Sequence, residues 1–391
     1  MHRLSRNLIL LATLLLLLLL SACQGAPAAS PPEASPLTVT PTAPLAPSLT
    51  PSPTQPLPTA SPTPVPTETA LPSPTEEPIT TLLFTGVIVP ARCVQAAIDA
   101  SGNPDYPYEA VRDIISQADL AIGTLNATIS DIPVHTGCIR TYLLVGSSEN
   151  ADALQRAGFD VMSVATNHIK NCGLPTCGDQ AFFDTLANLR RVGILPVGAG
   201  NNHAEAMQPV VVEVNGVRFG IVSLGHIEPM AFAGEDTPGI AVLNEENIYA
   251  AVAAAREVSD VVIFMPHWGP EDAATPTWIQ RNLAKVIVEA GADLVVGNHT
   301  HVVQGYQELG GVPVFYGLGN FVFDQTWARD HSQGVILKVM YQGTKYLGFE
   351  LIPTHVDQSG HVTIADPDEA QEILDRIEQV NRVLQLPTPV P

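Results

Sequence analysis

Short apolar runs alternate with longer segments of helical pattern along most of the chain. Three of these runs, residues 261–265, 294–297 and 314–317, are rich in β-branched side chains and have no polar face. Strands with this pattern are buried on both sides, as in the parallel part of an α/β sheet. Further strands are predicted at residues 81–89, 120–125, 161–165 and 195–197.

Helical periodicity fills most of the spaces between these runs. The predicted helices span residues 109–117, 151–157, 179–192, 245–257, 277–290 and 368–386. Gly193, directly after the third of them, is a typical helix stop. Strands that alternate with helices indicate an α/β fold.

Two features show that the sheets cannot be purely parallel. Asn215-Gly216 joins two runs of residues 210–222, and this pair is the strongest short signal for a β-hairpin. The last apolar runs, at residues 334–341, 346–356 and 361–364, follow one another without helices and indicate antiparallel pairing. We therefore expect mixed sheets in an α/β sandwich.

The first 22 residues have the pattern of a signal peptide. Basic residues at the front are followed by a leucine-rich run that is too short to span a bilayer, and the segment ends in Leu20-Ser21-Ala22 before Cys23. This ending resembles a bacterial lipobox, which implies cleavage and lipidation at Cys23. The expected location is the extracytoplasmic face of a bacterial cell membrane, with the membrane bound through a lipid anchor.

Residues 23–78 consist mostly of Pro, Thr, Ser and Ala. Such a segment has too few aromatic and β-branched side chains to offset the entropy lost on ordering. We expect it to be a disordered tether that leads to a globular domain at residues 79–365 and a C-terminal helix and tail at 366–391.

The net charge limits which partners the protein could bind, and the cysteine content indicates disulfides. The formal net charge is −21, which argues against nucleic acid as a partner because nucleic acid requires basic surfaces. Four cysteines follow Cys23, and in an exported protein they are compatible with two disulfides in any of three connectivities. We favour Cys93 with Cys138 and Cys172 with Cys177, which closes a short loop.

Polar residues stand where the predicted strands end. His267 follows the run at 261–265, Asn298 to His301 follows that at 294–297, and Asn320 comes shortly after that at 314–317. Ligand sites in open α/β sheets lie at the carboxyl ends of the strands, so one rim would receive all of them. Imidazole is the commonest protein ligand for Zn, which makes a metal site the functional interpretation.

Several segments together resemble one family. They are Leu82 to Gly86, Ala118 to Gly123, Gly158 to His168, Gly193 to Gly200, His267 to Gly269, Gly291 to Gln304 and Gly317 to Asp324. In this order they resemble the bacterial capsule-synthesis CapA family, which is associated with poly-γ-glutamate production. The resemblance implies a metallophosphatase-like fold, a four-layer α/β sandwich of mixed sheets flanked by helices.

The resemblance also implies roles for individual residues. Asn167, His267, His299 and His301 match metal ligands of the family, and His168 matches the histidine that assists proton transfer. Arg92 and Asn320 are candidate substrate-binding residues, Arg92 because a polyanionic substrate needs a local basic group in an acidic protein.

Two departures from the family pattern remove carboxylates. Val87 stands where relatives carry Asp, and Asn126 stands where they carry Glu. Neither residue can neutralise the charge of two cations. We expect a degenerate site that holds at most one weakly bound Mn or Zn ion, with Asp131, Cys93 and Glu228 as candidate replacements.

Three functions remain open. The first is a lipoprotein that binds or handles an extracellular polymer such as poly-γ-glutamate, with weak or no hydrolase activity. The second is an active metal-dependent phosphoesterase or amide-bond hydrolase that uses His168 for proton transfer. The third is a structural lipoprotein of the cell envelope.

Overall fold

The computed structural model describes residues 77–132, 136–170, 179–227 and 229–386. These residues belong to one compact unit, residues 72–391. The predicted signal peptide, Cys23, almost all of the tether and the Cys172–Cys177 pair lie outside the described residues. Within the described part of the chain, no helix is both long and apolar enough to cross a membrane.

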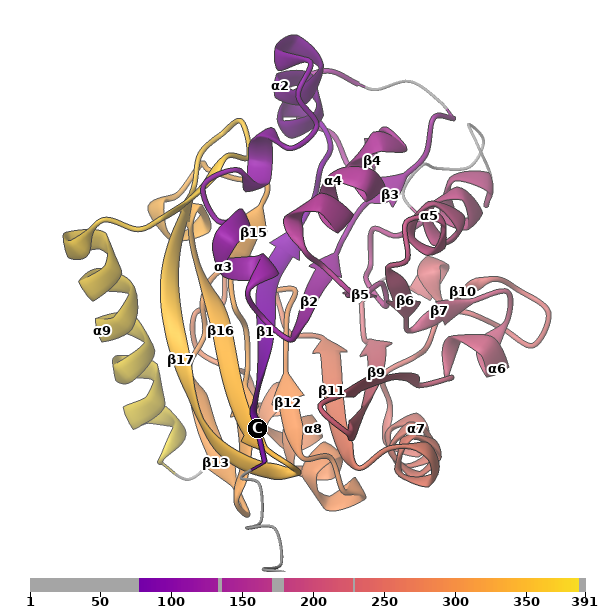
Figure 1. Cartoon of the computed structure of the whole chain (residues 1–391), viewed down its shortest axis with the longest axis vertical. Coiled ribbons are helices and arrows are strands. Elements are labelled where there is room, and N and C mark those ends of the chain that lie inside the picture. Colours follow the sequence, from indigo (N-terminus) through magenta and orange to yellow (C-terminus); the bar gives the residue numbers. More distant parts are fainter. Residues whose placement is uncertain (1–76, 133–135, 171–178, 228, 387–391) are drawn as a thin grey trace, which may run out of the picture. The chain divides into compact units, whose positions relative to one another are not determined.

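The first of two large sheets has eight strands (Figure 1). In order across the sheet they are β18 (Val362–Ile364), β17 (Lys345–Val356), β16 (Gln333–Gln342), β1 (Ile79–Ile88), β2 (Leu120–Leu125), β5 (Val161–Ser163) and β6 (Leu195–Val197), and β15 (Asn320–Val322) also pairs with β1. Strands β1, β2, β5 and β6 are parallel, whereas β16 to β18 are antiparallel, as the late apolar runs predicted.

The second sheet has six strands. They are β13 (Tyr306–Leu309), β14 (Val312–Phe315), β12 (Leu294–Val296), β11 (Val261–His267), β9 (Val217–Gly225) and β8 (Val210–Val214). Strands β11, β12 and β14 are neighbours and parallel, which confirms the interpretation of the three apolar runs. Strands β8 and β9 form the predicted hairpin, with positive φ at Asn215 (51°) and Gly216 (79°), as a type I′ turn requires.

Successive side chains of a central strand enter different apolar layers. In β11, Ile263 and Met265 join the cluster between the two sheets, whereas Val262 and Phe264 join the cluster under the helices of the second sheet. Both faces of β11 are therefore covered, which explains why its sequence lacks a polar face.

Helices complete the outer layers. Those that pack on the first sheet are α2 (Cys93–Ser101), α3 (Arg112–Ser116), α4 (Glu149–Ala157) and α5 (Gln180–Arg191), and those that pack on the second are α7 (Glu245–Val258) and α8 (Trp278–Ala290). The arrangement is helix, sheet, sheet, helix. The predicted four-layer α/β sandwich of mixed sheets is confirmed.

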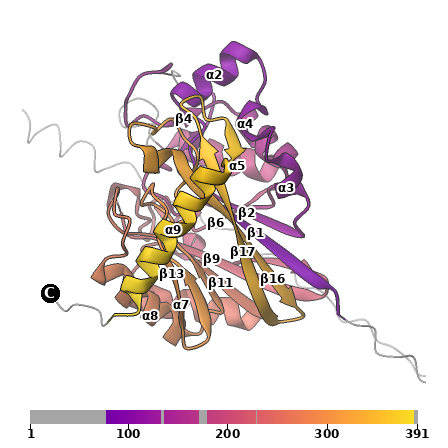
Figure 2. The ribbon, with the colours of Figure 1, turned by 90° about the vertical axis from the view of Figure 1, so that its left-hand side faces the viewer.

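Helix α9 (Pro367–Leu384) crosses one side of the sandwich (Figure 2). It contacts β17 of the first sheet and β13 of the second, and Ile373 and Ile377 enter the cluster between the sheets. Asp366 caps its N-terminus by accepting a hydrogen bond from the Glu369 backbone N–H. The helix therefore shields the inter-sheet core from water on this side.

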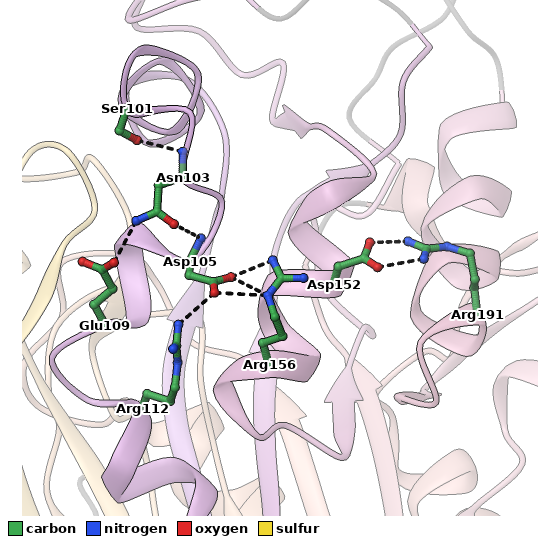
Figure 3. Close-up of polar contacts among 8 residues, drawn as sticks. All are labelled: Ser101, Asn103, Asp105, Glu109, Arg112, Asp152, Arg156 and Arg191. Atoms are coloured by element: carbon green, nitrogen blue, oxygen red, sulfur yellow. Dashed lines mark hydrogen bonds and ion pairs between the residues drawn. The ribbon is translucent and has the colours of Figure 1, made fainter.

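Ion pairs connect the helices that cover the first sheet (Figure 3). The Asp105 carboxylate accepts hydrogen bonds from Arg112 Nη2 at 2.9 Å and from Arg156 Nε at 2.8 Å. Asp152 pairs with Arg191 through both carboxylate oxygens, at 2.9 and 2.6 Å. These pairs are largely exposed, so each contributes about 1 kcal/mol or less to stability.

Some elements differ from the sequence-based expectation. Helix α2 was not predicted, because Arg92 rather than a typical capping residue precedes it, with a φ of 53°. The predicted helix at 109–117 is limited to α3. Short elements also escaped prediction: α6 (His203–Ala206), β3 (Thr128–Ile129), β4 (Val145–Gly146), β7 (Ala199–Gly200), β10 (Gly239–Ile240), β13 and β15.

Candidate functional site: a buried histidine cluster beside an open cavity

The predicted strand-end residues meet at one edge of the sandwich. His267 is the last residue of β11, and it forms a β-bridge with Asn298, which follows β12. His299 and His301 come next in the same loop, and Asn320 begins β15. All five side chains are buried. Long-range packing therefore brings these residues together, although in the sequence they follow separate strands.

Three side chains converge on one point. His267 Nε2 lies 3.0 Å from Asn167 Oδ1 and 3.1 Å from His299 Nδ1. The rings of His267 and His299 have centroids 4.7 Å apart, and those of His299 and His301 are 5.8 Å apart. The three imidazoles form a cluster, which we call the histidine cluster.

A chain of hydrogen bonds leads from this cluster to an acidic residue. His301 Nδ1 lies 2.8 Å from Asn320 Oδ1, and Asn320 Nδ2 donates to the backbone carbonyl of His331 at 3.0 Å. His331 Nε2 lies 2.6 Å from Asp272 Oδ1. Asn320 thus acts in the structure as a link between His301 and the segment that carries His331.

Backbone strain is concentrated near the cluster. Among the described residues, five that are not glycine have a positive φ, and Asn215 of the hairpin is one of them. The other four are Arg92 (53°), Asp272 (64°), His299 (110°) and His301 (61°). Such conformations cost about 1–3 kcal/mol each and persist mainly at functional sites. Their grouping here identifies this edge as the candidate site.

A cavity of about 630 Å³ opens beside the histidine cluster. Its walls include His168 and His301, together with Arg92, Glu271 and Asp272. His301 Nε2 is 3.9 Å from a Glu271 carboxylate oxygen. A ligand in this cavity would meet imidazole, guanidinium and carboxylate groups together.

Burial keeps the histidines neutral. Loss of solvent lowers the pKa of His168 and of His301 to about 4, and the positive charge of Arg92 contributes to the shift at His168. Burial, followed by the neighbouring histidines, lowers the pKa of His267 and His299 well below its ordinary value. These shifts favour the neutral form of all four rings at neutral pH, in which one ring nitrogen carries a proton and the other carries a lone pair.

The donor atoms do not fit a two-metal centre. His267 Nε2, His299 Nδ1 and Asn167 Oδ1 are close enough to share one Zn or Mn ion, but all three are neutral. In the part of the chain that the structure describes, no group of three or more His, Cys, Asp or Glu side chains is arranged to hold a metal ion. None of these three donors carries the negative charge that would balance a second cation.

The two positions where the resemblance places carboxylates are both buried. Val87 is fully buried in the apolar cluster under α2 to α5, and its register partners are Asn320 and Thr124. Asn126 is also buried; its Oδ1 accepts the His168 backbone N–H at 3.1 Å, while its Nδ2 has no hydrogen-bond partner among the described residues.

Of the three candidate replacement residues, the two that the structure describes, Asp131 and Cys93, are engaged in other contacts. Asp131 accepts hydrogen bonds from the backbone N–H and the hydroxyl of Ser148, at 2.9 and 2.7 Å. Cys93 forms a disulfide with Cys138, as predicted. Glu228 lies outside the described residues.

Arg92 connects two walls of the cavity. Its guanidinium forms an ion pair with Asp324, with Nε 3.1 Å from Oδ1, and its Nη1 donates to the carbonyl of Thr141 at 2.9 Å. The Asp324 carboxylate also accepts the Cys93 backbone N–H at 3.1 Å. Both charged side chains are buried, at 7% and 5% exposure. In this structure Arg92 therefore makes its hydrogen bonds to other groups of the protein.

Replacing Arg92 with Ala should lower the free energy of unfolding by about 3–5 kcal/mol, because Asp324 would remain as a buried charge without a cation. Urea denaturation at pH 7 measures this change. The matched control is Arg329→Ala, which removes an exposed ion pair with Glu372 and should change stability far less. Equal losses in the two variants would contradict the structural role of Arg92.

Sequence reasoning missed several residues of the cavity. These are Glu271, Asp272, Arg140 and Trp327 of the lining. It also missed His331, which is hydrogen-bonded to Asp272 behind them. Glu271 and Asp272 follow the strand-end residue His267 within five positions, a signal that could have been used. Arg140 and Trp327 come from loops far apart in sequence, and no local pattern links them.

Comparison with known proteins places the chain in a family. The family described as bacterial capsule synthesis protein PGA_cap matches residues 81–325, well over half of the chain. The chain belongs to this family. The matched region of the PGA_cap family extends from the first strand to the cavity wall at Gln325.

Individual relatives agree with the PGA_cap assignment. The PGA biosynthesis protein CapA of Bacillus subtilis (strain 168) is 28% identical over 262 residues, which cover 66% of this chain and 67% of that protein. The capsule biosynthesis protein CapA of Bacillus anthracis is 28% identical over 288 residues, 71% of this chain and 68% of that protein. A solved structure of a phosphatase from Mycoplasma pneumoniae matches with a TM-score of 0.46 at 14% identity and covers 75% of this chain and 97% of the other.

Proposed function

We propose that the protein is a surface-tethered lipoprotein that handles or binds an extracellular anionic polymer such as poly-γ-glutamate during capsule synthesis, and that its metal site is degenerate. Membership in the PGA_cap family supports the role in capsule synthesis. The relatives in Bacillus subtilis and Bacillus anthracis carry names that refer to this process.

The observation that carries the proposal is the open cavity beside the strained histidine cluster. A cavity of about 630 Å³ is in the range of ligand sites, and polar groups from several loops converge on it. The lack of carboxylates at Val87 and Asn126 favours binding over metal-dependent hydrolysis.

A second candidate is a metal-dependent phosphoesterase-like hydrolase. The convergence of His267, His299 and Asn167 favours it, because these atoms could share one ion. One ion held by neutral ligands would supply less charge to stabilise a transition state than a two-metal centre. Measurable hydrolysis of a phosphodiester by the metal-loaded protein would favour this candidate. A purely structural envelope lipoprotein would show neither hydrolysis nor polymer binding.

The proposal predicts that the full-length protein in detergent binds poly-γ-glutamate and does not bind neutral dextran of similar length. Isothermal titration calorimetry measures both at pH 7. His301→Ala, which removes an imidazole from the cavity wall, should weaken binding, whereas His361→Ala, outside the lining of this cavity, should not. Equal heats for the two polymers would rule out recognition of the anionic polymer.

Lipidation gives a separate prediction. If Cys23 carries the lipid anchor, Cys23→Ser should move the protein from the membrane fraction to the soluble fraction. Detergent phase separation followed by immunoblotting measures the change, and Cys93→Ser serves as a control that retains the anchor. A Cys23→Ser protein that stays in the detergent phase as firmly as the parent would contradict the lipobox interpretation.

A further inference from the structure

A second cavity adjoins the one beside the histidine cluster. This second cavity has a volume of about 380 Å³, and the two share Arg92, Arg140 and Trp327 in their walls. The three shared residues lie where the two cavities meet, and we call this place the passage. A ligand longer than one cavity would therefore pass over Arg92, Arg140 and Trp327.

Of the two arginines in this passage, only Arg140 remains available for a ligand. Arg92 is buried and is occupied by Asp324 and by the carbonyl of Thr141. Arg140 is exposed, and no carboxylate among the described residues pairs with it. Its guanidinium lies over the Trp327 ring, with Cζ 3.8 Å from the ring centroid. Stacking of this kind leaves the in-plane N–H donors of an arginine free.

Both residues of this stack, Arg140 and Trp327, are also held in place by other contacts. Arg140 lies between Cys138, which is joined to Cys93 by the disulfide, and Thr141, whose carbonyl accepts a hydrogen bond from Arg92. Trp327, 48% exposed, also lies against the buried His331, with ring centroids 5.5 Å apart. Such anchoring reduces the side-chain entropy lost on binding.

The charges around the larger cavity are unevenly distributed. Glu271 and Asp272 line it along with Arg140, and Asp272 is engaged with His331. An anionic ligand would be repelled by the carboxylates and attracted by the guanidinium. Planar two-pronged hydrogen bonding makes arginine well suited to carboxylate groups.

We propose that Arg140, stacked on Trp327, is the subsite that binds a carboxylate of the polymer where the chain passes from one cavity to the other. This inference rests on the proposed function, since it assumes that the site takes an anionic polymer. Arg140 would be a specificity-determining residue, and the Cys93–Cys138 disulfide would hold it in position.

The test compares the affinity of the full-length parent and of Arg140→Gln for poly-γ-glutamate, measured by calorimetry at pH 7. Loss of a charge-assisted hydrogen bond should weaken binding at least about tenfold. Trp327→Leu should also weaken binding. Arg140→Lys keeps the charge without the planar fork, so its affinity should lie between those of the parent and Arg140→Gln. Arg382→Gln on α9 and Trp278→Leu at the start of α8 are matched controls, because both side chains are exposed and line neither cavity.

The outcomes of this test distinguish the Arg140 subsite from the proposed polymer-binding function. Binding by the parent that is unchanged in Arg140→Gln would overturn the subsite and leave the proposed function standing. Failure of the parent to bind would overturn both. Tighter binding of inorganic polyphosphate than of poly-γ-glutamate, lost in Arg140→Gln, would show a phosphate subsite and overturn the carboxylate assignment. Circular dichroism of each variant establishes that it is folded.

The role of the disulfide is tested by replacing Cys93 and Cys138 together with Ser. The polymer affinity should fall as in Arg140→Gln, because the loop that carries Arg140 loses an anchor. A folded double variant that binds as tightly as the parent would overturn the positioning role of the disulfide.

Discussion

Between pH 7 and pH 5 the metal-free protein should lose several kcal/mol of its free energy of unfolding. His168, His267, His299 and His301 have a lowered pKa in the folded state, about 4 for His168 and His301. In the unfolded chain the same rings titrate near pH 6.5. Between these values the unfolded chain binds more protons than the folded protein, so stability rises with pH and is lost as the pH falls.

Urea denaturation in EDTA at pH 5, 6, 7 and 8 measures this dependence. Each histidine that is protonated only on unfolding contributes about 1.4 kcal/mol per pH unit. His168→Gln should reduce the number of protons taken up on unfolding by about one. Stability that stays constant between pH 5 and pH 7 would show that the histidines are not buried as neutral rings.

The variant Val87→Asp with Asn126→Glu should gain metal affinity. The two changes restore carboxylates where the resemblance to relatives places acidic ligands. Val87 pairs with Asn320 in the sheet, and Asn126 accepts the His168 backbone N–H. Neither change should suffice alone, because a two-metal centre needs both the bridging and the terminal ligand. We expect Mn or Zn to bind the double variant at least on the order of a hundredfold more tightly than the parent.

Stability provides a second measurement on the same variant. Without metal, two carboxylates at buried positions should lower the melting temperature, because removing a charge from water is costly. Adding Mn or Zn should restore much of this loss, and His299→Ala in the double variant should abolish the effect. A parent that already holds two equivalents of metal and hydrolyses a phosphodiester would contradict the degenerate-site account.

Much of the fold follows from local sequence patterns. The apolar runs at β11, β12 and β14 have no polar face because helices and a second sheet cover their two faces. Asn215-Gly216 determines a hairpin because both residues accept positive φ. Helix α2 was missed because the residue before it, Arg92, owes its conformation to contacts distant in sequence rather than to a capping side chain.

Only those residues of the site that stand at strand ends could be predicted from the sequence. His267, His299 and His301 were identifiable because each follows an apolar run, and parallel strands bring such ends to one edge. The Arg92–Asp324 pair joins residues 232 positions apart, which no local pattern encodes. Arg140 and Trp327 likewise meet only through tertiary packing.

The most direct test of the account is the effect of metal removal on polymer binding. The full-length protein is treated with EDTA, its Zn and Mn content is measured, and its affinity for poly-γ-glutamate is compared with that of the untreated protein. The account predicts fewer than two equivalents of metal before treatment and an affinity that changes less than about threefold after it. Loss of binding together with loss of two equivalents of metal would contradict the account.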